Sequence, residues 1–407
     1  MQMVSLDDLV PADDRYRRIE PLVNWAAVRA SAEPFYGDGG RPSVDPVVLV
    51  KVFLVAAVEG IGSMRETLRR AEVDLSIRRF LGYGLTERLP SHATLSYAHC
   101  VRFAGSSVFE QLFTQVLAQC RQAGLLDGGR LLVDATHVEA NAALQSLRAE
   151  LRVVEDGDDA ASEPEPEPEP AGRPALALAE PRSGPTPRRR ASNATAVSLT
   201  DPDARLRHKP GQRPHLVHRA QVATDPKNRV IVAVQAEPAT GHEGDALPAI
   251  IDRARWARHR VSEVGADQGY ASAAVYQALE EMQAAAFIPP LPNMRHTEHG
   301  HAARSRCKSP PGIGVAIDRM THAEGAISEL KLHHALDRAR CRGTAKLQVQ
   351  LLLAATAINL KRLINRPHAA SGAAGGDHHA AARAHLALIE ACLDWLRQTH
   401  RHPIRLL

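Results

Sequence analysis

Residues Leu131–Asn141 read LLVDATHVEAN, in which three apolar residues lead directly to an acid. The run follows a break at Gly128-Gly129. A short apolar run bounded by glycines is typical of a buried strand. The pattern therefore predicts a strand that presents the carboxylate of Asp134 at its end.

Two further acids lie in similarly marked places. Asp267 follows the apolar-rich run Val261–Ala266 and precedes a Gly-Tyr pair, so it also stands at the end of a predicted strand. Glu324 lies in a helical stretch with Lys331 two turns further on. Each acid has a plainer interpretation, since Asp134 and Asp267 are also suited to capping the turns that follow them. Taken together, the three carboxylates predict a divalent-metal site, because Mg²⁺ prefers oxygen ligands.

The composition of the 407 residues is that of a soluble globular protein, with 44% hydrophobic and 24% charged residues. The formal net charge of +4 is weak evidence for a polyanionic partner. The five cysteines include no CxxC pair, which argues against a disulfide framework and a structural zinc site. The amino terminus is acidic, and the most apolar run, Pro46–Val58, is too short to span a bilayer. We therefore expect a soluble, cytoplasmic protein.

Composition and periodicity divide the chain into three parts. Residues 1–125 predict an all-α domain that is suited to DNA binding or to packing as a scaffold. Residues 126–367 predict an α/β catalytic domain, interrupted at 155–197 by a Glu-Pro repeat and an Arg-rich stretch that we expect to be disordered. Residues 368–407 predict a low-complexity linker and a carboxy-terminal helix.

Within the second part, the predicted order is a strand, two further strands, a helix, a strand, a helix, a short strand and a helix that bears an acid. This order is typical of a ribonuclease-H-like mixed sheet with flanking helices. In such a fold the first acid lies on the central strand, the second follows the strand beside it, and the third projects from a nearby helix. We also expect a helix at 140–154, an irregular segment at 291–314, and long helices at 318–340 and 344–366.

The chain resembles the DDE transposases of bacterial insertion sequences over about 300 residues. The segments that carry the resemblance are Gly40–Val47, Phe80–Gly82, Pro90–Ser96, Val133–Ala142, Thr200–Arg205, Ala266–Tyr270, Arg342–Gly343 and Gln350–Lys361. The resemblance implies that Asp134, Asp267 and Glu324 are the catalytic, metal-binding acids.

The third motif departs from the family pattern of Tyr, two residues, Arg, three residues, Glu, six residues and Lys. Glu324 and Lys331 have the expected six residues between them, but four residues rather than three separate Arg319 from Glu324. The tyrosine position falls at Ala316, where no aromatic residue is near. Glu329, on the same helix, is the alternative third acid.

The resemblance implies a transposase that binds the terminal inverted repeats of its element, cleaves DNA and joins the ends to target DNA. Mg²⁺ is the implied cofactor, with Mn²⁺ as a substitute, and synapsis of two ends implies a homodimer or a higher oligomer. Cations suited to contacting DNA phosphates are Arg319, Lys331, Arg342 and Lys346. Two alternatives remain open, a metal-dependent nuclease without strand transfer and a catalytically inactive DNA-binding protein. The histidines at 296–301 match no common zinc spacing.

Overall fold

The computed structural model describes residues 5–37, 39, 43–149, 196–208, 211, 213–294 and 296–365. All of them belong to one compact unit, Met1–Asn365. The predicted linker and carboxy-terminal helix lie outside the described residues. The predicted insertion does too, except for its last two residues, which begin a short strand.

The described part of the first 128 residues is helical, as expected. Polar residues cap several of these helices, and the side chains of Asp45, Ser63 and Ser91 each accept a backbone N–H bond from the first turn that follows. The helices are α1 (Leu6–Leu9), α2 (Arg15–Ile19), α3 (Trp25–Ala32), α4 (Pro46–Val58), α5 (Met64–Val73), α6 (Leu75–Leu81), α7 (His92–Tyr97) and α8 (Val108–Gln122), with the π-helix η3 (Ala98–Arg102) after α7. Nearly every residue of α4 is buried, so this helix forms the centre of the group.

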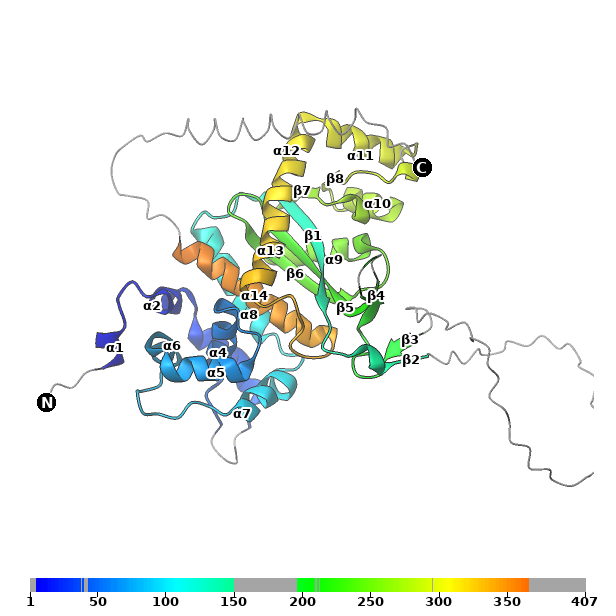
Figure 1. The fold of residues 1–407 in the computed structure, drawn as a ribbon. Coiled ribbons are helices and arrows are strands. Elements are labelled where there is room, and N and C mark those ends of the chain that lie inside the picture. The colour runs from blue at the N-terminus through cyan, green and yellow to red at the C-terminus, as the bar shows by residue number, and fades with distance from the viewer. Residues whose placement is uncertain are drawn as a thin grey trace, which may run out of the picture. The chain divides into compact units, whose positions relative to one another are not determined.

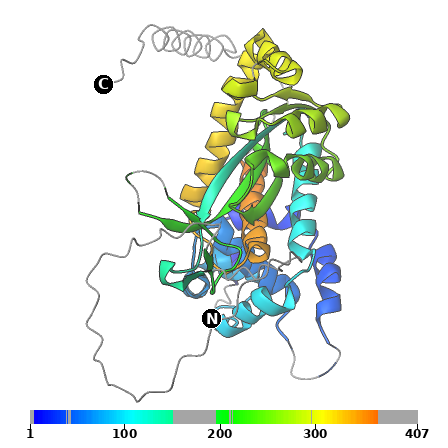
Figure 2. The ribbon, with the colours of Figure 1, turned by 90° about the vertical axis from the view of Figure 1, so that its right-hand side faces the viewer.

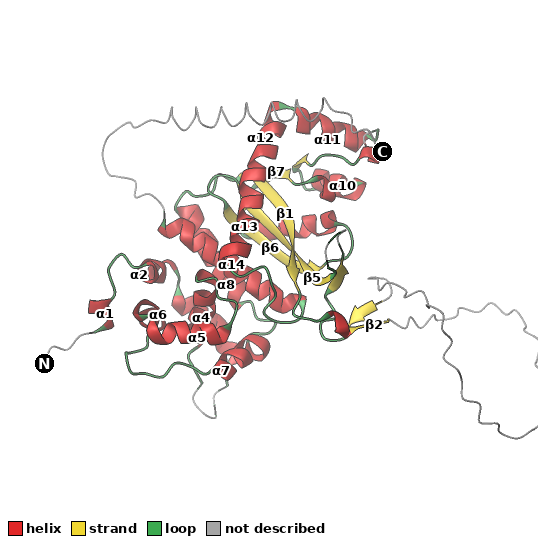
Figure 3. Cartoon of the chain, in the orientation of Figure 1, coloured by secondary structure: helices red, strands yellow, loops and turns green. Residues whose placement is uncertain are grey.

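A mixed sheet forms the second part of the unit (Figures 1 and 3). Its strands are β1 (Gly129–Glu139), β4 (Arg205–Arg207), β5 (His215–Asp225), β6 (Val230–Pro238), β7 (Val261–Gly265) and β8 (Ala285–Phe287). The central strand β1 pairs antiparallel with β5 and parallel with β7. Strands β5 and β6 form an antiparallel hairpin, and β7 pairs parallel with β8. The coarse prediction, a mixed α/β sheet preceded by helices, is confirmed.

Helices flank this sheet (Figure 2). They are α9 (Leu247–Trp256), α10 (Ala273–Glu281), α11 (Glu298–Lys308), α12 (Pro310–Asp318), α13 (Glu324–His333) and α14 (Thr344–Ile364). The π-helix η8 (Arg319–Ala323) joins α12 to α13, so that Pro310–His333 is one continuous helical segment that packs beside β1.

Three local predictions are wrong. The helix expected at 318–340 begins earlier, at Pro310, and ends at His333. The segment 291–314 is not irregular, because Thr297 caps α11 and Ser309, followed by two prolines, caps α12. The helix expected from Ala140 is absent from the described residues, where a 3₁₀ turn, Leu144–Ser146, leads into a two-stranded ribbon of β2 (Leu147–Ala149) and β3 (Ala196–Ser198). This ribbon pairs residues on either side of the insertion, a contact that local periodicity does not reveal.

Helix α14 lies between the amino-terminal helices and the sheet, in contact with α4, α8 and β6 (Figure 1). Its Asn359 side chain accepts a bond from the backbone N–H of Ile231 at 2.9 Å and donates to the Ile231 carbonyl at 2.8 Å. Gln348, three turns earlier on the same face, does the same for the backbone of Ala236 and Val234. These amides satisfy backbone groups of β6 that the β5 pairing leaves open.

This helix is also long and apolar enough, by length and composition, to cross a membrane. However, 72% of its most apolar window is buried inside the protein, as in a core helix.

We predict that Asn359→Leu lowers the free energy of unfolding by about 2–5 kcal/mol. The substitution leaves a buried N–H and a buried carbonyl without a partner, each at a cost of about 1–3 kcal/mol. Urea unfolding of the full chain measures the loss. The matched control is Ala345→Ser, at an exposed position of the same helix, which should change stability by less than about 0.5 kcal/mol. Equal midpoints for the two variants would contradict the role of Asn359.

Candidate functional site

Strand register places Asp134 and Asp267 side by side. Leu132 of β1 pairs with Gly265 of β7 in a parallel arrangement. Asp134 and Asp267 each come two residues later, so they stand at equivalent positions along neighbouring chains. Adjacent strands lie about 4.8 Å apart, which places the two residues side by side. The prediction that Asp134 ends its strand is wrong, because pairing with β5 continues β1 to Glu139, whereas Asp267 does follow the end of β7.

Asp134 is held in a partly dehydrated environment, with 16% of its side chain exposed. Burial raises its pKa to about 6, and the negative charges of Asp267 and Glu324 add to this effect. The backbone N–H of Ala135, 2.9 Å from Oδ1, and the charge of Arg319 act in the opposite direction on this pKa. The charges of both other predicted acids therefore affect the pKa of Asp134.

Asp267 lies directly before a crowded turn. Its Oδ1 accepts a 2.8 Å bond from the backbone N–H of Gly269, which is the capping role that its position also suggested. A Cβ atom on Gly269 would lie 2.7 Å from an Oε2 atom of Glu243 and 3.0 Å from Asp267 Oδ1. Only glycine fits here without a shift of these carboxylates. The carboxylate of Glu243 thus lies at the same turn as that of Asp267.

Arg319 connects the first and third acids. Its Nη1 lies 3.8 Å from Oδ2 of Asp134 and 3.4 Å from Oε1 of Glu324. Glu324 is the first residue of α13 and its side chain is half exposed. The predicted DNA contact Arg319 is therefore an ion-pair partner of two of the acids in this structure.

The extra residue between Arg319 and Glu324 has a structural counterpart. The residues Arg319–Ala323 form a π-helix, in which backbone bonds run from i to i+5 rather than i+4. A π turn accommodates one more residue than an α turn, so Arg319 and Glu324 still share a face although four residues separate them. The departure from the family spacing thus leaves the geometry of this pair intact.

Glu329, the alternative third acid, points elsewhere. Its carboxylate pairs with the Arg362 guanidinium on α14, and its charge acts on Lys361 of the same helix. Glu324 is the acid of α13 whose charge acts on Asp134. This arrangement favours Glu324 over Glu329 as the third member of the group.

The other predicted DNA-binding cations contact further parts of the chain. Lys331 donates a 2.9 Å bond to the backbone carbonyl of His137, and so ties α13 to β1. Arg342 donates to the backbone carbonyl of Asn141, beyond the end of β1. Lys346 lies close enough to His99 to lower the pKa of that histidine.

An ion-pair network that sequence reasoning missed holds the acid-bearing helical segment on the sheet. Arg130 of β1 pairs with Glu263 of β7 at 2.9 Å and with Asp318 of α12 at 2.6 Å. Asp318 directly precedes the π turn, so this network fixes the position on the sheet from which the π turn, with Arg319 and then Glu324, starts. No motif marks Arg130, because its partners lie 133 and 188 residues away.

The residues present fit a divalent cation. Burial, and after it the charges of Asp267 and Glu324, raise the pKa of Asp134, so its carboxylate is costly to ionise without a cation nearby. Such a group is stabilised by a cation, and an all-oxygen donor set suits Mg²⁺ or Mn²⁺. Arg319 supplies part of this positive charge within the protein.

Two family models match this chain. One, described as a transposase domain (DUF772), covers residues 4–99, and the other, described as a transposase DDE domain, covers residues 292–364. The second match includes Arg319, Glu324 and Lys331. No curated protein matches the chain.

Solved structures of a Mos1 transposase paired-end complex with the left transposon end and of a pre-cleavage Mos1 transpososome are also similar, at 10% identity. The alignments cover 81% of this chain and 82% and 81% of the Mos1 chains, respectively, with a TM-score of 0.19, which is too low to support an argument about fold. The comparison evidence is therefore the pair of family-model matches, by which residues 4–99 are similar to a transposase domain and residues 292–364 to a transposase DDE domain.

Proposed function

We propose that this chain is a transposase that binds the terminal inverted repeats of its element, cleaves DNA at their ends and transfers the strands to target DNA. The observation that carries the proposal is the approach of Asp267 and Glu324 to the half-buried Asp134 on the central strand, where their charges add to the effect of burial in raising the pKa of Asp134. The strand order β6-β5-β1-β7-β8, antiparallel in its first half and parallel in its second, supports a ribonuclease-H-like core.

The three acids would hold Mg²⁺, with Mn²⁺ as a substitute. When bound, divalent ions activate an oxygen nucleophile and stabilise the charge on the leaving oxygen in phosphodiester chemistry. Asp134 is held rigidly by the central strand, whereas Glu324 is more exposed and better placed to adjust to DNA. Arg319 balances the charge of the acids and, beside the reacting phosphate, would help to position it.

The other predicted DNA-binding cations would hold the DNA rather than take part in cleavage. Arg342 and Lys346 lie around the start of α14, away from the acids, and would contact the DNA backbone without reading its sequence. Lys331 would position DNA near the cut site while it anchors α13 on β1. Because transposition brings two element ends together, the active species would be a homodimer or a higher oligomer.

We predict that Asp134→Asn, Asp267→Asn and Glu324→Gln each reduce cleavage of labelled element ends in Mg²⁺ on the order of 10³-fold. The bound ions supply several kcal/mol of transition-state stabilisation, and each substitution removes a charged ligand. DNA binding, measured by gel shift, should persist in all three variants. Glu329→Gln on the same helix is the matched control and should cleave normally. If Glu329→Gln were inactive and Glu324→Gln active, Glu329 rather than Glu324 would be the third acid.

The same assay distinguishes transposition from nuclease activity. Target plasmid added to the reaction should yield joined products whose ends match the labelled strand. Cleavage without any joined product would favour the metal-dependent nuclease. Binding without cleavage would favour an inactive DNA-binding protein.

We predict that Asp134→Asn stabilises the metal-free protein at pH 7.5 by roughly 1–3 kcal/mol. The folded-state pKa of about 6 lies above the ordinary value of 3.8, so the contribution of Asp134 to stability is greatest below pH 4 and is lost as the pH rises through 6. The advantage of the variant should therefore shrink as the pH falls from 7.5 to 4. Unfolding in EDTA measures it, and Asp252→Asn on the exposed face of α9 is the control. A variant no more stable than wild type at pH 7.5 would contradict the prediction.

We predict that deleting Met320 preserves cleavage to within about tenfold, because removing the extra residue converts the π turn to an α turn and leaves Arg319 and Glu324 on one face. Met320 is 57% exposed, so little packing is lost. The control is deletion of Ser328, which lies inside the regular α13 and would rotate Lys331 by about 100° relative to Glu324. Equal loss of cleavage in both deletions would show that the π turn is not a neutral insertion.

A further inference from the structure

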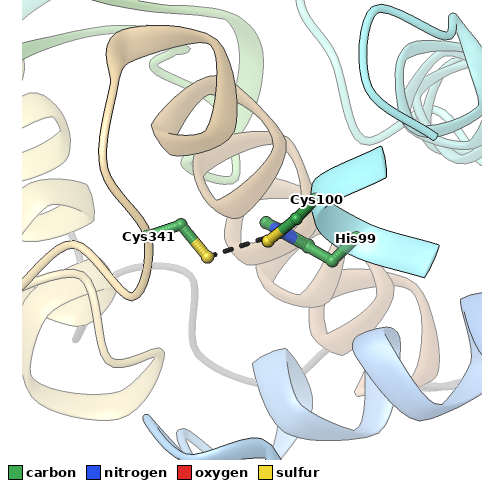
Figure 4. A group of neighbouring side chains, drawn as sticks. All are labelled: His99, Cys100 and Cys341. Carbon is green, nitrogen blue, oxygen red and sulfur yellow. Dashed lines mark hydrogen bonds between the residues drawn. The ribbon is translucent and has the colours of Figure 1, made fainter. Parts of the chain in front are cut away.

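His99, Cys100 and Cys341 form a cluster of neighbouring side chains (Figure 4). His99 and Cys100 lie on η3, in the amino-terminal helical region, whereas Cys341 lies in the loop between α13 and α14. One potential ligand atom from each residue lies within 4.8 Å of the other two. Both cysteines are free thiols.

The separations within the cluster match those of a zinc ion's coordination shell. With zinc–sulfur bonds of about 2.3 Å and zinc–nitrogen bonds of about 2.0 Å, tetrahedral angles place nitrogen and sulfur ligands about 3.5 Å apart. The Nδ1 atom of His99 lies 3.5 Å from Cys341 Sγ and 4.0 Å from Cys100 Sγ. The first separation equals the tetrahedral value and the second exceeds it by about 0.5 Å, so local side-chain shifts would place the three ligand atoms at three corners of a tetrahedron.

Contacts on both sides hold these ligands in place. The His99 ring packs edge-on against Phe53 of α4 at 5.5 Å between centroids. The loop before Cys341 is tied down by the Gln350 side chain, which accepts from the Arg340 N–H and donates to the carbonyls of Ala335 and Arg338. The site is thus largely formed before any ion binds.

The buried guanidinium beside the cluster lacks hydrogen-bond acceptors at two nitrogens within the described part of the chain. Nε and Nη2 of Arg340 are buried and have no hydrogen-bond partner among the described residues. Arg340 and Lys346 also act on His99, where burial and these two charges lower the pKa to about 4 and so keep the imidazole neutral and able to bind metal. Two thiolates on a zinc ion would supply sulfur acceptors beside the unpaired guanidinium, and the centre itself would carry no net charge.

We propose that His99, Cys100 and Cys341 bind one zinc ion that joins the amino-terminal helices to the loop between α13 and α14. The fourth position faces a cavity of about 310 Å³ that the three ligands and Arg340 line, so water can complete the shell. Soft thiolate and imidazole donors select Zn²⁺ over Mg²⁺, which separates this site chemically from the carboxylates. Binding would release the two thiol protons to solvent.

The test uses the full chain, purified under reducing conditions with zinc present and then desalted. Elemental analysis should find about one zinc per chain, lost in Cys100→Ser and Cys341→Ser. Replacement by Co²⁺ should give a thiolate-to-cobalt charge-transfer absorption, which carboxylate sites do not produce. Cys307→Ser, at a half-buried cysteine elsewhere, is the matched control and should keep both signals.

Asp134→Asn should also keep both signals, which shows that the zinc does not reside at the acids. Because the serine variants can lose stability, alkylation of the wild-type thiols provides a second measurement, in which zinc should slow modification of Cys100 and Cys341 but not of Cys307. Absence of zinc and of the cobalt absorption in the wild-type protein would overturn the proposal. Zinc that survives both serine substitutions would also overturn it, as would a Cys100–Cys341 disulfide that excludes the ion.

Discussion

The structure depends on how α14 is seated against the edge of the sheet. Asn359 and Gln348 present amide groups to backbone atoms of β6, in the way that another strand would. The same helix packs on α4 and α8, so one buried element joins the amino-terminal helices to the sheet. Burying the open edge of a sheet is costly, because its backbone N–H and carbonyl groups lose their bonds to water. The two amides replace those bonds where α14 covers the β6 edge. The loop that carries Cys341 is fixed by a third amide of this helix, Gln350.

The carboxylate site follows from two further constraints. Parallel pairing of β1 with β7 aligns Asp134 with Asp267, because each lies two residues beyond a paired position. The Arg130 ion pairs then hold the acid-bearing helical segment at the same place, and the π turn orients Arg319 and Glu324 together. Burial and the nearby acids make the Asp134 carboxylate costly to ionise, and a carboxylate in such surroundings is well suited to holding a cation.

Elements with strong local signals were predictable. The apolar run before Asp134, the caps at Asp45 and Ser63, and the Gly-Tyr pair after Asp267 each specify structure within a few residues. The predicted helix after Ala140 was wrong because its residues pair instead with β3, across the insertion. The segment at 291–314 was misjudged because its many charges and glycines outweighed two clear capping signals at Thr297 and Ser309.

By itself, the sequence predicted a mixed sheet preceded by helices, the apolar strand segments before Asp134 and Asp267 and the resemblance to DDE transposases, because periodicity, caps and motifs act over short stretches of chain. Only the tertiary structure showed that β1 continues past Asp134, paired Glu329 with Arg362 and Arg319 with Asp134 and Glu324, and brought Cys341 to His99, 242 residues away. These contacts depend on the register between packed elements. That register is set by side chains that meet only once the chain has folded, so no local pattern encodes it.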